Sequence, residues 1–241
     1  MATGTFAEKH NKITAKITQP NDNRYWVNTI LFSFVLVFLL AAYQTVKGIR
    51  LDVYQLNIVF SFTGMYLIGL SFALSGLTYF WNFVDTKVVY RKYLGLVGFY
   101  YVFSHSLFSL VNYLLIPSAP QPSFDLEYNW RVGEMLISNS WAFLSALASL
   151  GIFAYMTIIS NKYSMLELGG LMWRKQLRYL GYFAYALIVI HFGLKRFNVW
   201  TNWLSEPNGL PPHSLILMVF VILVFVLRIA LYFHQKRKKS I

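Results

Sequence analysis

The 241-residue sequence contains no cysteine, and this absence removes several kinds of chemistry. Disulfides, cysteine-ligated iron–sulfur clusters, thiolate-ligated haem and covalently attached c-type haem all require cysteine. A metal in this protein must therefore be held by histidine, carboxylate or methionine side chains.

Charged residues are also scarce, at 12% of the chain, which is about half the fraction of a typical soluble domain. Hydrophobic residues make up 57% and aromatic residues 19% of the chain, and the mean hydropathy is +0.49. The net charge is +12, from 21 basic and 9 acidic residues. Because the basic residues flank apolar runs, we assign them to membrane orientation and lipid headgroups, and we expect no nucleic-acid partner.

The apolar residues gather in six runs that are long enough to cross a bilayer, for which about 20 residues are needed. They predict an all-α membrane protein, a six-transmembrane-helix bundle, in residues 25–235. A polar tail (1–24) and a basic tail (236–241) flank this domain. The predicted spans are Tyr25–Val46, Tyr54–Phe80, Tyr93–Leu115, Leu136–Ser160, Leu177–Phe197 and His213–Phe233.

The loops differ in basic residues, and cytoplasmic loops carry the excess of Lys and Arg. One side of the predicted bundle holds 15 of them and the other side 5. The sequence therefore predicts that both termini are cytoplasmic. The 15 are Lys9, Lys12, Lys16, Arg24, Lys87, Arg91, Lys92, Lys162, Arg174, Lys175, Arg178, Lys236, Arg237, Lys238 and Lys239; the 5 are Lys47, Arg50, Arg131, Lys195 and Arg196.

Two histidines, His105 and His191, lie inside separate predicted spans. An ionisable side chain at membrane depth is costly and indicates a functional site. His105 follows the start of its span by about 18 Å and His191 by about 21 Å, at 1.5 Å per residue. Since both spans run outward from the cytoplasm, the two imidazoles reach similar depth in the outer half of the membrane. They are candidate axial ligands of a b-type haem. The alternative is that each is a buried histidine bonded to a neighbouring helix.

Three basic residues on the outer side have two interpretations. Lys195 and Arg196 follow His191 at about one helical turn, and Arg131 is predicted on the same side. They can pair with haem propionates, or their charges can extend to the membrane interface.

The segment YRKYLGLVGFYYVFSHSLFSLVNYLL resembles the third helix of ferric-reductase-like transmembrane domains. The segment SNKYSMLELGGLMWRKQLRYLGYFAYALIVIHFGLKRF is similar to their fifth helix and its preceding loop, particularly in the haem-binding membrane subunit of bacterial methionine sulfoxide reductase systems. The resemblance covers roughly residues 57–232. In that superfamily, which includes the STEAP metalloreductases and the NADPH oxidases, spans 3 and 5 supply the haem histidines, and His105 and His191 occupy the matching positions.

The sequence departs from two-haem members of that superfamily on the cytoplasmic side. Where those members carry an inner pair of histidines, this chain has Arg91 or Lys92 and Arg178. Since guanidinium has no lone pair for iron, the resemblance implies one haem b per chain. In such relatives a flavin, FMN or FAD, can take the inner place. The flavin phosphate would then be held by Arg91, Lys92, Arg174, Lys175 and Arg178, and the flavin ring would stack on Trp173. Alternatively, the five basic residues belong to the excess of positive charge in cytoplasmic loops, and Trp173 belongs to an interfacial aromatic belt.

The resemblance implies an electron-transfer subunit of an oxidoreductase in the bacterial inner membrane. The 241 residues contain no GxGxxG segment that follows a strand, so we expect electrons from a separate donor subunit, a flavoprotein or a quinol. The expected acceptor is an extracytoplasmic protein, a ferric chelate or oxygen. A non-redox structural subunit of a larger membrane complex and a transporter are the competing interpretations.

Overall fold

The computed structural model describes residues 22–81, 84, 87–115, 129–132 and 135–239. Six helices in these residues are long and apolar enough to cross a membrane, which confirms the predicted all-α six-helix bundle. The predicted tail at residues 1–21 and the last residues of the basic tail, 240–241, lie outside the described residues. The six are α2 (Asp22–Val46), α3 (Val53–Phe80), α4 (Tyr90–Leu115), α5 (Asn139–Ile159), α7 (Gly170–Ser205) and α8 (His213–Lys239).

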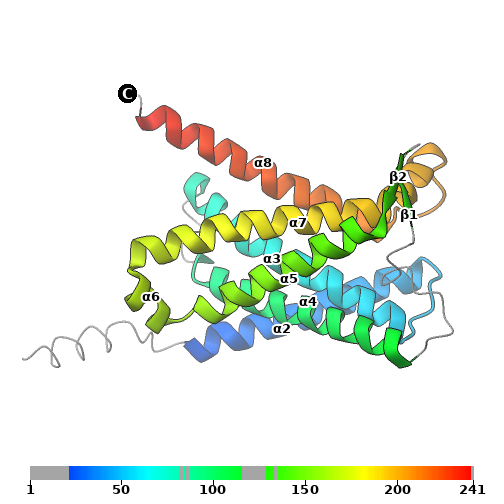
Figure 1. Ribbon diagram of the computed structural model, residues 1–241, viewed down its shortest axis with the longest axis horizontal. Coiled ribbons are helices and arrows are strands. Elements are labelled where there is room, and N and C mark those ends of the chain that lie inside the picture. Colours follow the sequence, from blue (N-terminus) through cyan, green and yellow to red (C-terminus); the bar gives the residue numbers. More distant parts are fainter. Residues whose placement is uncertain (1–21, 82–83, 85–86, 116–128, 133–134, 240–241) are drawn as a thin grey trace, which may run out of the picture.

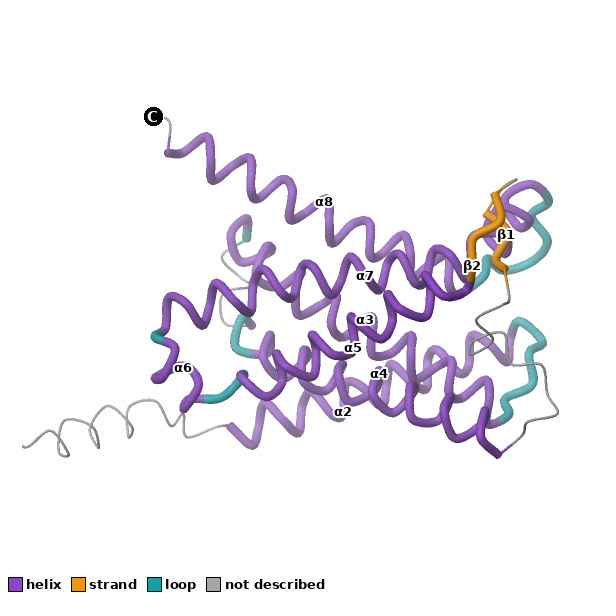
Figure 2. Tube along the Cα trace, viewed as in Figure 1, coloured by secondary structure: helices purple, strands orange, loops and turns teal. Residues whose placement is uncertain are grey.

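The helices run back and forth between two ends of the bundle (Figures 1 and 2). One end carries the short helix α6 (Lys162–Leu168), the start of α2 and the last turns of α8; we call it the α6 end. The other end carries the strands β1 (Asn129–Val132) and β2 (Met135–Ser138) and the connections at residues 47–52 and 206–212; we call it the hairpin end. Helix α2 therefore begins at the same end of the bundle at which α8 finishes, as an even number of crossings requires.

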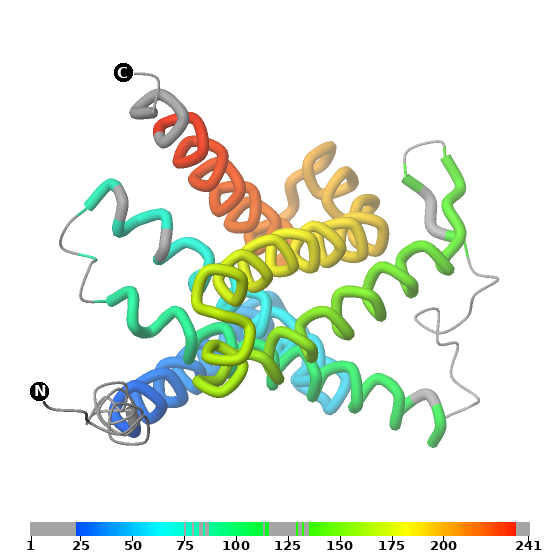
Figure 3. The backbone as a smooth tube through the Cα atoms, turned by 60° about the vertical axis from the view of Figure 1, so that its left-hand side comes forward, coloured from blue at the N-terminus to red at the C-terminus, as the bar shows by residue number. Residues whose placement is uncertain are grey.

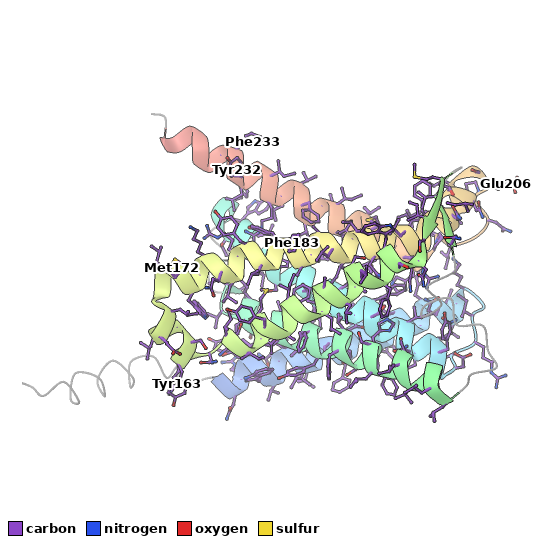
Figure 4. The ribbon with its side chains drawn as sticks, in the orientation of Figure 1. Tyr163, Met172, Phe183, Glu206, Tyr232 and Phe233 are labelled. Carbon is purple, nitrogen blue, oxygen red and sulfur yellow. The ribbon has the colours of Figure 1, made fainter. Side chains whose placement is uncertain are left out.

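The outer faces of the bundle are apolar. Phe38, Ile158 and Leu171 are 71%, 70% and 77% exposed. On α8, Tyr232 and Phe233 point away from the other helices (Figure 4). Contiguous apolar surface of this extent is unfavourable in water and is covered by lipid tails in a bilayer. Length, composition and exposure together define an integral membrane protein with lipid as its partner.

Helix α3 lies at the centre of the bundle. In its most apolar 18-residue stretch about 65% of the residues are buried, against 22–28% in the corresponding stretches of the other five long helices. It packs on α2, α4 and α8, while α7 packs chiefly on α5. The end-tilted view in Figure 3 shows α8 diverging from the rest toward the C-terminus. Val59 and Phe62 of α3 join Tyr185 of α7 and Leu217 of α8 in the main core.

A glycine pair sets the close approach of α3 and α4. A Cβ atom on Gly98 would lie 3.0 Å from the carbonyl oxygen of Gly64, and one on Gly64 would lie 2.8 Å from that of Gly98. Small residues allow membrane helices to approach at this distance. Gly64 is seven residues after Asn57 and Gly98 is seven before His105, so the same antiparallel crossing aligns Asn57 with His105.

Several helix ends differ from the predicted spans, and α8 runs beyond Phe233 into the basic tail, to Lys239. The fourth span begins at Asn139 rather than Leu136, because residues 135–138 pair as an antiparallel strand with β1. Ser138 instead caps α5, and its Oγ accepts the Ser140 N–H at 3.2 Å. Helix α7 has 36 residues and extends the predicted Leu177–Phe197 span at both ends. Its polar ends are helical too, so it is about 54 Å long at 1.5 Å per residue, well beyond the hydrocarbon core.

Candidate haem site between α4 and α7

His105 of α4 is oriented by Asn57 of α3. Its Nδ1 lies 3.0 Å from the backbone oxygen and 3.0 Å from the side-chain oxygen of Asn57. The Asn57 amide nitrogen donates to Ser109 Oγ at 2.9 Å, which turns the amide oxygen toward the imidazole. Since both partners are acceptors, Nδ1 carries the proton, and the Nε2 lone pair is free to bind a metal.

His191 of α7 is held in the same way by α5. Its Nδ1 lies 2.7 Å from the backbone oxygen of Ala142, and a carbonyl oxygen can only accept. Nδ1 is therefore the donor here too. Within the described residues, neither Nε2 makes a hydrogen bond. A histidine that ligates a metal generally donates its other ring N–H to a carbonyl or carboxylate, and both imidazoles have this arrangement.

The fold brings the two imidazoles toward each other. They lie close enough to interact electrostatically, and Lys195 and Arg196 act on both of them. Helix α4 packs mainly on α3, and α7 packs mainly on α5, so direct contacts between α4 and α7 are sparse among the described residues. The two histidines therefore come from helices that are each packed mainly on a different neighbour.

The sequence-predicted propionate partners are placed only in part. Lys195 and Arg196 lie on α7 beside His191, on the side that leads to the hairpin end. Arg131 lies on strand β1, paired with Leu136 of β2, and its side chain is outside the described set. The backbone thus puts all three residues in the half of the bundle that holds the histidines.

On the α6 side of the histidines, three arginines lie near one another, and two of them, Arg91 and Arg228, interact with Tyr182. Arg91 of α4 and Arg178 of α7 both interact electrostatically with Arg228 of α8. Arg228 lies over the Tyr182 ring at 5.6 Å and donates from Nη2 to the backbone oxygen of Phe72. We call Arg91, Arg178 and Arg228 the inner arginine cluster. The sequence analysis missed the part played by Arg228, although an arginine inside an apolar span was a visible signal.

The remaining predicted flavin contacts are held by local interactions. Lys92 is exposed, with its ammonium 5.6 Å from the Tyr93 ring. The Trp173 indole donates to the Ile159 oxygen at 2.7 Å and ties the start of α7 to the end of α5. Arg174 donates from Nε to its own helix, at Gly170. Lys175 is exposed on the first turns of α7.

The chemistry that the described side chains can provide follows from this donor set. They contain no group of three or more His, Asp or Glu that could enclose a metal ion. A haem needs only two axial ligands, because the macrocycle supplies the other four, and the two oriented Nε2 atoms fit that requirement. No protein-family model matches the chain, and no curated protein is significantly similar to it.

Proposed function

We propose that the chain is a membrane b-type cytochrome of the ferric-reductase-like class, which passes electrons across the bilayer. The observation that supports this function best is the shared arrangement of His105 and His191. Each donates from Nδ1 to an oxygen on a neighbouring helix, and neither Nε2 has a hydrogen-bond partner in the described part of the chain. When bound, haem b supplies one-electron redox chemistry between these two nitrogens.

The residues around the pair support the cofactor in two ways. Lys195 and Arg196 provide positive charge near the imidazoles, which suits the carboxylates at the edge of a haem. Apolar residues of α3 and α7, including Phe62 and Phe192, pack with their rings 5.9 Å apart and keep water from the interior. A dry surrounding of this kind is one of the means by which a protein sets a haem potential.

The distribution of basic residues supports a direction of electron transfer across the membrane. The α6 end carries the described part of the larger basic group, so we assign it to the cytoplasm and the hairpin end to the outside. In the plasma membrane of a bacterium, electrons would then enter at the α6 end from a flavoprotein, a bound FMN or FAD, or a quinol. They would leave at the hairpin end to an acceptor protein or a ferric chelate.

The inner arginine cluster supports a single haem and an anionic donor. Arg91, Arg178 and Arg228 bring three guanidinium groups to the inner half of the bundle. Guanidinium cannot ligate iron, but it binds phosphate with two parallel hydrogen bonds. A flavin phosphate or an acidic surface of the donor protein is the chemistry that suits this cluster.

The proposal is tested by the visible spectrum of the full chain purified in a mild detergent from haem-sufficient cells. Dithionite should produce the sharp bands of a low-spin haem, and a pyridine haemochrome assay should give about one haem per chain. A protein that stays colourless after haem reconstitution would instead favour a structural subunit. A value of two would show that the inner arginines do not replace a second ligand pair.

A further inference from the structure

A cavity opens at the hairpin end, beyond the histidine pair. Its volume is about 200 Å³, and it lies among the end of α2, the first turns of α3, the outer part of α7 and the start of α8. Its polar lining consists of Gln44, Lys47, Tyr54, Gln55, Arg196 and His213, with Ser214 beside them. The cavity therefore lies where the chain turns from one span to the next.

The charge in this cavity has one sign. Lys47 lines it from the connection after α2 and Arg196 from α7, and none of the residues that line it is acidic. The carboxylate nearest in sequence, Asp52, is occupied at the start of α3, where it accepts the Gln55 N–H at 2.7 Å. Two cations that face the same cavity repel each other, and an anion bound between them would relieve that repulsion.

His213 points to a ligand independently of the cations. Only 6% of its surface is exposed, and its Nδ1 is buried without a hydrogen-bond partner in the described part of the chain. Its ring is held by Tyr43 and Phe62, at centroid distances of 5.1 and 4.8 Å. A buried polar nitrogen without a partner costs free energy, so a group that bonds to Nδ1 would be stabilised there.

The start of α8 adds a third source of positive potential. His213 is the first residue of this 27-residue helix. The N–H groups of Leu215 and Ile216 donate to the Pro212 oxygen, so the helix start offers those of His213 and Ser214, together with the positive end of the helix dipole. The start of the helix is fixed in place. The Tyr43 hydroxyl donates to the Pro211 oxygen at 2.6 Å, and the Trp200 indole donates to Ser214 Oγ at 3.0 Å.

We infer that this cavity is a binding site for one phosphate group, held by Lys47, Arg196, His213 and the start of α8. Donors approach from two helices, α7 and α8, and from the connection after α2, which suits the tetrahedral oxygens of phosphate better than the planar pair of a carboxylate. The group can belong to a phospholipid headgroup, because the cavity lies at the end of the spans, or to a soluble phosphate compound. The site goes beyond the proposed electron transfer and needs no haem.

The test uses the full chain in a neutral maltoside detergent and measures the binding of a soluble phosphate and of a phospholipid in separate experiments. Inorganic phosphate is titrated calorimetrically in phosphate-free buffer. Separately, native mass spectrometry compares dioleoyl phosphatidylglycerol with dioleoylglycerol, which has the same tails and no phosphate. The test variants are Lys47→Gln and His213→Phe, and the second keeps a ring in the aromatic contacts while it removes Nδ1. The matched control is Arg50→Gln, which removes one charge from the same connection at an exposed position outside the cavity.

We expect Lys47→Gln to weaken binding by on the order of tenfold, since a hydrogen bond to a charged group contributes about 1.5–3 kcal/mol. His213→Phe should also weaken it, and Arg50→Gln should not. Saturable binding of inorganic phosphate with this pattern identifies a soluble ligand. Retention of phosphatidylglycerol but not dioleoylglycerol, with the same pattern, identifies a lipid. Equal binding by wild type, Lys47→Gln and Arg50→Gln in both arms would overturn the inference, whatever the haem content of the protein.

Discussion

Replacement of Gly98 by alanine tests whether the α3–α4 crossing positions the haem ligand. The added Cβ would lie 2.8 Å from Ile68 Cγ1 and 3.0 Å from both the Gly64 oxygen and the Ile68 nitrogen. Carbon atoms pack best at about 3.5–4.0 Å, so the contact with Ile68 Cγ1 is short by roughly 0.7 Å or more. The side chain can rotate away, but the two backbone atoms cannot, and the helices must separate.

The size of the effect is isolated by comparison with Gly151→Ala on α5. That glycine is also helical, and a Cβ there would meet nothing within 4 Å. Both variants gain up to about 1 kcal/mol of helix propensity, so their difference reports the clash alone. We expect Gly98→Ala to be about 1–3 kcal/mol less stable than Gly151→Ala in denaturant unfolding, the usual cost of overpacking. It should also lose haem, because His105 moves away from Asn57. Equal stability and equal haem content in the two variants would refute the reasoning.

Three further predictions concern the ligand support, the donor side and the topology. Asn57→Leu should weaken haem binding by about 10–100-fold, because Asn57 orients a proposed metal ligand. Thr63→Val should leave haem binding unchanged, because the Thr63 hydroxyl bonds only within α3. Haem titration of the two reconstituted variants measures the difference. Arg228→Gln should slow haem reduction by the physiological donor in stopped-flow measurements without altering the spectrum. Lys162→Gln is the control, because it removes a charge at the same end outside the cluster. Equal rates in the two variants would remove the cluster from the electron path. Alkaline phosphatase inserted after Asn208, in the connection at the hairpin end, should be active; an inactive fusion there would reverse the proposed direction of transfer.

The spans were predictable because membrane helices leave a strong signal in the sequence. Each must satisfy its backbone hydrogen bonds internally and present about 20 apolar residues to lipid. All six predicted spans are helices, and most ends differ from the prediction by only a few residues. The exceptions have local causes. Residues 135–138 are apolar enough to extend a span but pair as a strand. Helix α7 continues into polar sequence at both ends, and α8 continues into the basic tail as far as Lys239.

For the candidate site, the sequence indicated the two histidines and their proximity, but not the residues that contact them. The two imidazoles are ionisable groups inside apolar spans, where such groups are rare, so they are easily recognised in the sequence. Their partners do not. Ala142 contributes only a backbone oxygen, which any residue would supply, and Asn57 is one of several polar residues in its span. The gathering of Arg228 with Arg91 and Arg178 depends on how α8 lies against α3 and α7, which no local pattern specifies.

The central claim is that His105 and His191 ligate one haem, and the most direct measurement is the reduced visible spectrum of four single variants. His105→Ala and His191→Ala should each lose the low-spin, six-coordinate signal. His213→Phe and His234→Ala should keep it, because these rings lie at the bundle ends and contact Phe62 and Phe80 instead. Full retention of low-spin haem in His191→Ala, or its loss in His234→Ala, would contradict the assignment.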